Sequence, residues 1–377
     1  MTSAKKRIAF LTLNRFNSFL CDGVSNSSLE LLSYLKKQGH DVAVVSFLTN
    51  EPYRQEVFRH GVESSSKGGR SSATLRGIPV HQELLPFDQA TLFDDTRVFL
   101  KTATDRIREH NIESVVTVED DFLALFAAAA LDIPGAHFFH SPSYARSFRK
   151  FPLFLNLLGK KPVFAVSEFL QKNIQEDLHV RTEVWPPLFD LERYVVERKD
   201  APAASLGFYS AGPHKGDGVV DRLARLRPDW EFMVVGRNYS SPRGERPENL
   251  GFAGDVTDSR EFYARITVLL VPSLEVEGYS RVILEAAVNG IPAVANRIGG
   301  IPEAMGSSGI LVDFNPGSID EPELDRLAHV YAREVEKIFR DPGLYTEFSR
   351  KARLRAEEYA GAQAITSRRH YEKYFSR

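Results

Sequence analysis

Short apolar runs alternate with amphipathic stretches along the first half of the chain. The apolar run 8–13 precedes a polar loop and residues 25–37, where leucines recur at helical spacing and Ser25 to Ser28 offer N-caps. With the apolar run 41–47, these residues predict a strand–helix–strand unit with a right-handed crossover. Further strands are predicted at 114–118, 136–139 and 163–167, and further helices at 91–110, at 122–131 and from 168 onward. Residues 63–72 have no apolar period and predict a mobile loop.

The same alternation restarts after residue 185. Strands are predicted at 205–210, 230–235, 268–271, 292–295 and 309–312, and helices at 217–226, 258–265, 281–289 and through most of 321–375. Two alternating sets predict an α/β chain with two doubly wound parallel-sheet domains, which bind ligands at the carboxyl ends of their strands. We expect the joint between Pro186 and Pro202, where prolines and charged residues interrupt the pattern.

Composition narrows the class of protein. A length of 377 residues suits two domains. The net charge of −2 argues against a nucleic-acid partner, and the single cysteine, Cys21, excludes an internal disulfide. We expect no membrane span, because no uncharged apolar stretch approaches about 18 residues. The apolar run after the basic start is too short for a signal peptide, so we expect a cytoplasmic location.

Several familiar catalytic motifs are absent. The chain has no G-x-x-x-x-G-K-[ST], no complete G-x-G-x-x-G after its first strand, no H-E-x-x-H and no G-x-S-x-G. Their absence argues against a nicotinamide dehydrogenase and against common hydrolase classes. The acidic run 119–121 is either a metal-binding cluster or a helix start, where carboxylates are favoured by the helix dipole. We favour the helix start.

The turn at residues 210–216 is a candidate phosphate site. It joins a predicted strand to a predicted helix and contains Gly212, Lys215 and Gly216. Small residues let backbone N–H groups approach an anion, and the lysine adds a positive charge. Taken alone the signal is weak, because strand–glycine–helix turns are also common structural devices.

A pair of glutamates carries a stronger signal. Glu277 precedes Gly278 at a predicted helix start, and Glu285 follows eight positions later. Eight positions correspond to about 800°, or roughly 80° away from the same helix face. Carboxylates suit sugar hydroxyls because each accepts several hydrogen bonds. Alternatively, Glu285 is a salt-bridged helix residue. Its apolar neighbours predict partial burial, so we expect it to have a partner.

Taken in order, the motifs resemble those of retaining glycosyltransferases of family 4, and they cover nearly the whole chain. The matching segments are Asp22-Gly23-Val24, Gly39 to Val42, Phe138 to His140, Val166-Ser167, His214 to Gly216, Val271 to Ser273, Glu277 to Ser280, the E-x7-E pair, and Gly299 to Glu303. The resemblance implies a GT-B fold of two facing Rossmann-like domains with an interdomain cleft. We expect an acceptor-binding domain at 1–187, a nucleotide-sugar-binding domain at 188–355 and a helix at 356–377 that crosses back.

The resemblance also implies residue roles. His140, Lys215 and Glu277 would be catalytic: His140 reaches the transferred sugar, Lys215 neutralises the donor diphosphate and Glu277 holds sugar hydroxyls. Glu285 would hold the ribose. The remaining donor-binding positions are implied to be Gly23, Gly212, Gly216, Gly278, Tyr279 and Ser280.

The implied activity is a hexosyltransferase-type transfer by front-face attack, in which the donor phosphate takes the acceptor proton. We expect no metal and no cofactor beyond a nucleotide-sugar donor, with a UDP-sugar slightly favoured. The acceptor would be a sugar, a lipid-linked molecule or a small molecule; the oligomeric state stays open. Alternatives are a GT-B nucleotide-sugar epimerase, a glycoside phosphorylase and a non-catalytic binding subunit.

Two features qualify this interpretation. The family usually has an arginine shortly before the lysine, but residues 205–214 contain none, so Arg237, Arg281 and Arg297 are the candidates to replace it. Residues 146–161 combine five basic residues with several apolar ones. This segment either rests on the inner face of an anionic membrane or, as we favour, packs its apolar side on the sheet.

Overall fold

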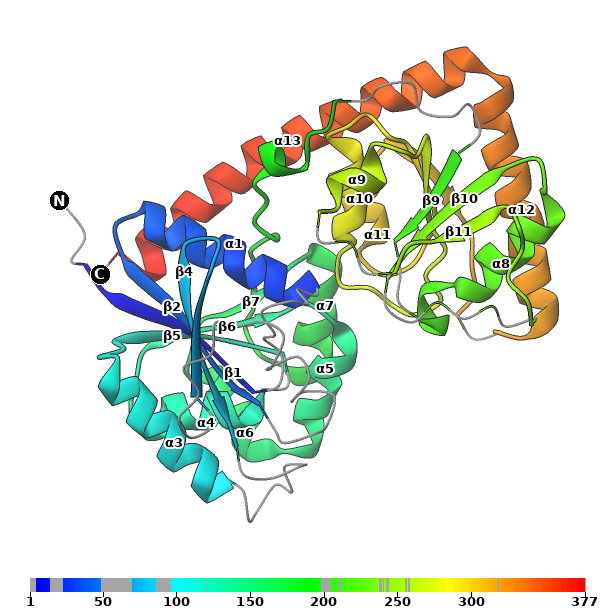
Figure 1. The fold of residues 1–377 in the computed structure, drawn as a ribbon. Coiled ribbons are helices and arrows are strands. Elements are labelled where there is room, and N and C mark those ends of the chain that lie inside the picture. Colours follow the sequence, from blue (N-terminus) through cyan, green and yellow to red (C-terminus); the bar gives the residue numbers. More distant parts are fainter. Residues whose placement is uncertain are drawn as a thin grey trace. The chain divides into compact units, whose positions relative to one another are not determined.

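The computed structural model divides the chain into two compact units (Figure 1). The first runs to Phe189 and includes Ile365 onward, and the second is Asp190–Ala364. The sequence placed these boundaries at 187/188 and 355/356. The structure describes residues 5–13, 23–48, 70–85, 96–119, 121–197, 205–209, 212–236, 239, 241, 244–254, 256, 258–316 and 319–376.

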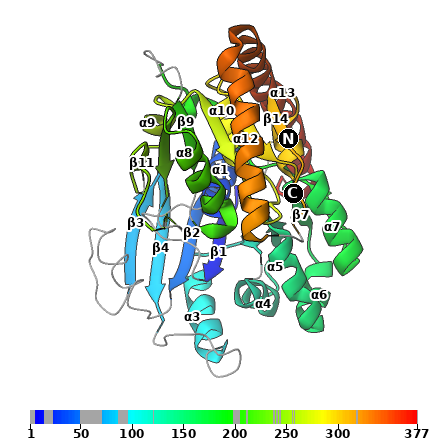
Figure 2. The same cartoon turned by 90° about the vertical axis from the view of Figure 1, so that its right-hand side faces the viewer.

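The first unit is built on an eight-stranded sheet with the order β3-β4-β2-β1-β5-β6-β7-β8. Its strands are β1 (Arg7–Leu13), β2 (Asp41–Leu48), β3 (Arg70–Leu75), β4 (Ile78–Leu84), β5 (Ser114–Val118), β6 (Gly135–Phe139), β7 (Val163–Ala165) and β8 (Glu183–Val184). Every strand pair is parallel except β3 with β4. Figure 2 shows β3, β4, β2 and β1 lying side by side in this order.

Both faces of this sheet are covered, which explains the unbroken apolar runs of its central strands. The helices are α1 (Gly23–Lys37), α3 (Thr96–Glu109), α4 (Phe122–Ala130), α5 (Pro142–Ser147), α6 (Pro152–Gly159) and α7 (Glu168–Leu178). Ile8 and Phe10 of β1 belong to the core that contains the α1 leucines. Ala9 and Leu11 point to the opposite face and join the α3 and α4 core, as the strand period of two requires.

One local prediction in this unit was wrong, and a second was wrong for the few of its residues that the structure describes. Helix α1 begins at Gly23, so Ser27 and Ser28 lie inside it, where their hydroxyls donate to the carbonyls of Gly23 and Val24. Of the predicted mobile loop, residues 63–69 lie outside the described part and residues 70–72 belong to β3. Strands β3 and β4 form a hairpin across Arg76 and Gly77, both with positive φ (53° and 72°), as a tight hairpin turn favours.

The second unit has a six-stranded parallel sheet with the order β11-β10-β9-β12-β13-β14. Its strands are β9 (Ser205–Tyr209), β10 (Glu231–Val235), β11 (Leu250–Phe252), β12 (Val268–Val271), β13 (Ala293–Asn296) and β14 (Gly309–Val312). The helices are α8 (Asp217–Leu226), α9 (Arg260–Tyr263), α10 (Arg281–Ala287), α11 (Ile301–Met305) and α12 (Glu321–Arg340). One core lies against α8 and α12 and the other against α9, α10 and α11. Figure 2 shows α8 and α12 side by side.

The last helix, α13 (Pro342–Tyr374), contributes residues to both units. The sequence predicted helices through most of 321–375, and the structure divides them at Asp341, which precedes Pro342. In the first unit, the indole N–H of Trp185 donates to Ser367 Oγ at 3.1 Å. Nε2 of His370 lies 2.8 Å from the carbonyl oxygen of Val184. The end of α13 is therefore part of the core of this unit.

The segment 146–161 uses most of its apolar side chains for packing. Phe148, Phe154 and Leu158 are buried, and Phe148 and Phe154 contact the ring of Phe122. Leu153 is the exception, with 57% exposure. Within the described part of the chain, no helix is both long and apolar enough to span a bilayer.

Candidate active site

The second sheet has a topological switch point between β9 and β12. From β9 the chain moves to β10 and β11 on one side, then returns to β12, β13 and β14 on the other. The loops after β9 and β12 therefore diverge at the carboxyl edge of the sheet. Open α/β sheets bind ligands at such a point. Both motifs that the sequence singled out in this half of the chain follow these two strands.

The turn after β9 is pressed against the loop after β12. Residues Pro213–Lys215 form a short 3₁₀ turn, and Gly216 follows with a φ of +99° before α8. A Cβ on Gly216 would lie 2.2 Å from the carbonyl oxygen of Pro272, so only glycine fits. Leu274 N–H donates to the carbonyl of His214 at 2.9 Å. The two loops are thus held together by backbone contacts.

Lys215 and Glu277 meet across the switch point. Nζ of Lys215 donates to Oε1 of Glu277 at 2.6 Å, and the hydroxyl of Ser273 donates to the same oxygen. The lysine side chain is 37% exposed and that of the glutamate 12%. Burial alone would raise the pKa of Glu277. The adjacent ammonium and the hydrogen bonds from Lys215, Ser273 and Ser280 outweigh burial and hold this pKa below its usual value of 4.5. The carboxylate is therefore ionised at neutral pH.

The Glu277 loop is also fixed from β13 and α12. Nδ2 of the buried Asn296 donates to the carbonyl of Ser273 at 3.0 Å. The hydroxyl of Tyr331 in turn donates to Oδ1 of Asn296 at 3.0 Å. Gly300 N–H donates to the carbonyl of Glu277 at 2.8 Å. A Cβ on Gly299 (φ +59°) would lie 2.2 Å from that same oxygen. The sequence motifs include Gly299 and Gly300, but sequence reasoning missed Asn296 and Tyr331.

Residues 278–280 lead from this loop into α10. Gly278 and Ser280 are buried, and Tyr279 is half-buried. The ring of Tyr279 packs on Tyr359 of α13, with the ring centroids 5.8 Å apart. The contact between Tyr279 and Tyr359 thus attaches to α13 the segment that was predicted to bind the donor through its backbone.

Glu285 is buried, and Tyr263 and Arg281 lie against its side chain. The hydroxyl of Tyr263 donates to Oε2 at 2.9 Å, and Nε of Arg281 lies 3.7 Å from Oε1. Burial and the nearby Glu285 raise the pKa of Tyr263 above its usual value, so this hydroxyl stays protonated and remains a donor. The expectation that Glu285 is enclosed and has a partner is confirmed; the sequence did not identify Tyr263.

The three candidates to replace the missing arginine lie in different surroundings. Arg281 is buried, and its guanidinium lies against Glu285 and the hydroxyl of Tyr194, which it contacts at 3.2 Å. Nε of Arg297 donates to Oδ1 of Asp313 at 2.8 Å. Arg237 lies outside the described residues, as do Ser210 and Ala211 of the phosphate turn. Gly212 is described and has a φ of +112°.

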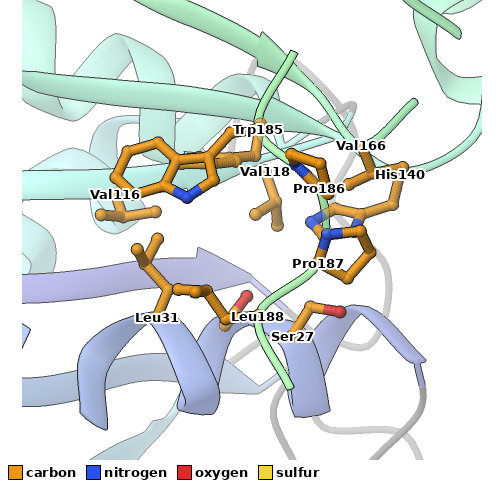
Figure 3. Close-up of a pocket in the computed structure, with 12 residues that line it drawn as sticks. Ser27, Leu31, Val116, Val118, His140, Val166, Trp185, Pro186, Pro187 and Leu188 are labelled. Atoms are coloured by element: carbon orange, nitrogen blue, oxygen red, sulfur yellow. The ribbon is translucent and has the colours of Figure 1, made fainter. Parts of the chain in front are cut away.

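His140 lies in the first unit, immediately after β6. It borders a small, open pocket, together with Ser27, Trp185 and Pro187 (Figure 3). His140 N–H donates to Oε1 of Glu119 at 2.9 Å. Gly23 is the first residue of α1, and its predicted neighbour in the motif, Asp22, is not described.

The acidic run 119–121 supports the helix-start interpretation through Asp121. One oxygen of Asp121 accepts the backbone N–H of Ala124 and caps α4. The other accepts the N–H of Leu13 at 2.7 Å, joining the ends of β5 and β1. Asp120 is outside the described part. Among the residues that the structure describes, no three His, Cys, Asp or Glu side chains gather to hold a metal.

Comparison with protein families identifies the chain. The model for Glycosyltransferase Family 4 matches residues 21–193, and that for Glycosyl transferases group 1 matches residues 213–322. The chain belongs to glycosyltransferase family 4. Each of the two units thus has its own family match, and the resemblance of the motifs to those of family 4 glycosyltransferases is confirmed.

Individual relatives agree with this assignment. An uncharacterized glycosyltransferase of Haemophilus influenzae is 24% identical over 387 residues, covering 94% of this chain and 96% of the relative. Sucrose-phosphate synthase from Thermosynechococcus elongatus has a similar fold, with a TM-score of 0.71 at 15% identity, covering 99% and 100% of the two chains. HepE of Anabaena, in complex with UDP and glucose, has a TM-score of 0.68 at 17% identity, covering 98% and 99%. The glycosyltransferase therefore has the GT-B fold.

Proposed function

We propose that this glycosyltransferase moves a hexose from a UDP-sugar to a hydroxyl of its acceptor, with retention of the anomeric configuration. The observation that carries the proposal is the Lys215–Glu277 pair at the switch point of the second sheet. The pair offers a cation for a diphosphate beside a carboxylate for sugar hydroxyls. The structural relative HepE was solved with UDP and glucose, which supports a nucleotide-sugar donor.

In this proposal Lys215 faces the donor diphosphate. Its ammonium is partly exposed, so it can hold Glu277 and a phosphate oxygen together. Gly216 opens α8, whose first N–H groups and dipole favour an anion at the same place. Glu277 accepts hydroxyl hydrogen bonds from the sugar, because its carboxylate is ionised at neutral pH. Gly278 to Ser280 supply backbone N–H groups, and Glu285 binds the ribose.

The proposed reaction needs no side-chain nucleophile. The bond between the sugar C1 and the phosphate oxygen breaks, and the acceptor oxygen bonds to C1 on the same face. The acceptor proton passes to the departing phosphate oxygen. Lys215 stabilises the negative charge that develops on the diphosphate, and electrostatic stabilisation of this kind often contributes most to an enzyme's rate enhancement. His140 contacts the transferred sugar. We propose no metal ion in this step.

The test is a transfer assay with UDP-glucose, UDP-galactose and UDP-N-acetylglucosamine, each offered with sugar, lipid-linked and small-molecule acceptors. UDP release reports turnover, and proton NMR of the product gives the anomeric configuration. An α-linked product from these α-linked donors supports the proposal. A β-linked product overturns retention. Donor binding without turnover with any acceptor favours a non-catalytic binding subunit.

We also propose a cytoplasmic location, in which the exposed side of residues 146–161 contacts the inner face of the membrane while most of its apolar side chains pack inward. Residues 140–161 contain no acidic side chain. Lys150, Lys160 and Leu153 are exposed, as is Arg146, which lies 3.9 Å from the carboxylate of Asp177. Basic residues around an exposed apolar one suit an anionic lipid surface. Co-sedimentation with phosphatidylglycerol vesicles, but not with phosphatidylcholine vesicles, is the expected result, and equal behaviour with both would contradict it.

A further inference from the structure

We infer that Glu119 is a positioning residue for His140. The inference rests on the proposed function, in which His140 contacts the transferred sugar. In the sequence, Glu119 stands out only as part of an acidic run. In the structure it connects the end of β5 to the end of β6, and its side chain has no exposed surface.

The backbone of Glu119 turns sharply where β5 ends. Its N–H still follows the ladder and donates to the carbonyl of Phe138 at 2.9 Å, one step beyond the Val118–Phe138 pair. Its φ is +54°, a left-handed conformation that non-glycine residues adopt at a cost. Conformations of this kind gather at functional sites, where the surrounding structure enforces them. The paired part of β5 ends just before this turn, at Val118.

The side chain of Glu119 replaces a main-chain carbonyl as the next hydrogen-bond acceptor for β6. In an extended ladder, the next N–H of β6 would find a carbonyl on β5. Here the N–H of His140 donates to Oε1 of Glu119 at 2.9 Å instead. On the other edge of β6, Val166 N–H donates to the carbonyl of Phe139 at 3.2 Å. The backbone on both sides of the Phe139–His140 peptide is thus fixed, and with it the direction of the His140 Cα–Cβ bond.

The fixed backbone in turn determines the position from which the His140 side chain extends. His140 borders the pocket of the first unit, where Ser27 and Pro187 also lie (Figure 3). A charged acceptor holds an N–H more strongly than a neutral carbonyl does. Burying a carboxylate is costly unless it is well bonded. A buried glutamate in a left-handed turn is an expensive acceptor for a backbone N–H, and it is explained if the position of His140 has to be precise.

The experiment compares E119A, E119Q, H140A and the double variant E119A/H140A. The readouts are kcat and KM for hydrolysis of UDP-glucose, with water as acceptor, and for any transfer reaction found. We expect E119A to lower kcat about tenfold with little change in KM for the donor. E119Q keeps an oxygen at the Oε1 position and should retain at least a third of kcat. In the H140A background, E119A should change kcat less than twofold, because it acts through His140.

Asp121→Ala is the matched control. Asp121 is a neighbouring buried carboxylate that caps α4 and bonds Leu13 N–H, so D121A reports the effect of lost stability alone. D121A and H140A should be additive in kcat, whereas E119A and H140A should not. Equal loss from E119A in both backgrounds, or no loss from E119A at all, would overturn the inference.

A second readout separates this inference from the proposed function. The imidazole Cε1–H resonance of His140, assigned by its absence in H140A, should shift in E119A and stay near its native position in E119Q. An unmoved resonance in E119A overturns the positioning role. Absence of hydrolysis and transfer in the native enzyme overturns the proposed function instead, and the resonance still reports whether Glu119 positions the ring.

Discussion

Lys215 and Glu277 form an ion pair, and the lysine stabilises the ionised form of the enclosed glutamate. The glutamate side chain is mostly enclosed, and its carboxylate is held by the ammonium and by the Ser273 hydroxyl. Removing the lysine from such a pair leaves the enclosed carboxylate poorly compensated. At the scale of single residues, donor binding and the stability of the loop after β12 are therefore coupled.

Substitution of either residue should impair transfer. We expect K215A and E277A each to lower the transfer rate by at least about tenfold, or roughly 1.4 kcal/mol in the barrier. Steady-state assays of UDP release measure the effect. The control is E275A, which truncates an exposed glutamate of the same loop. Native activity in both K215A and E277A would show that the site lies elsewhere.

The depressed pKa of Glu277 predicts a pH-dependent contribution to stability. Since the folded pKa is below 4.5, the unfolded chain takes up the proton first as the pH falls. The difference in Tm between the native protein and E277Q should be constant above about pH 4.5 and shrink as the pH falls below it. E275Q, at an exposed position, should show no such trend. A difference that grows in acid would reverse the sign and refute the assignment.

At the scale of elements, the site depends on three loops that share backbone contacts, those after β9, β12 and β13. Gly216 lets the turn after β9 touch Pro272, and Gly299 lets the turn after β13 touch the backbone of Glu277. Three strand ends are thus held together, with Asn296 and Tyr331 behind them. Displacement of any one turn should move the residues that we assign to the donor.

A matched pair of glycines tests this. Gly216 and Gly39 have almost the same φ, +99° and +98°, but an added Cβ meets backbone only at Gly216. G39A should carry only the left-handed backbone cost of about 1–2 kcal/mol and keep its activity. G216A carries the same cost and must also displace Pro272, so it should lower Tm further and reduce transfer at least about tenfold. Calorimetric scans give the Tm of both variants, and transfer assays give their activity. Equal losses of Tm and activity in G39A and G216A would contradict the role assigned to the Gly216–Pro272 contact.

The end of α13 should respond to mild acid through His370. This side chain is fully buried, and burial lowers its pKa despite the hydrogen bond to Val184, which raises it. Charged groups around it include Glu183 and Lys373. Below about pH 6.5 the unfolded chain binds a proton at His370 more readily than the folded chain does. The free energy of unfolding therefore decreases as the pH is lowered. The Tm of the native protein should therefore drop more between pH 7.5 and 5.5 than that of H370Q; an equal drop would refute this.

At the scale of the whole molecule, the sequence predicts the two β/α sets and most of their strands, because buried parallel strands are continuous apolar runs. It does not predict β3, which is polar, or β4, whose apolar residues are followed by His81, Gln82 and Glu83. It also misses β8 and β11, which have two and three residues. The GT-B fold and the family were both predicted from ordered motifs. What could not be predicted is which loops meet, because that depends on strand order.

The candidate site shows the same limit. Lys215 and Glu277 were each recognised from their local motif, but the ion pair exists because β9 and β12 are neighbours. Tyr331 and Tyr263 act from distant segments of the chain and carry no motif of their own. Glu119 was visible as an acid after a strand, but its left-handed turn and its bond to His140 were not.

The most direct test of the proposed donor site is calorimetric titration of UDP into the native protein and K215A, with a metal chelator present. We predict that the native protein binds UDP without added metal and that K215A binds it at least about tenfold more weakly, a loss of roughly 1.4 kcal/mol. Equal affinity in the two proteins, or no binding of UDP to the native protein, would contradict the assignment of Lys215 as the diphosphate contact of a UDP-sugar transferase.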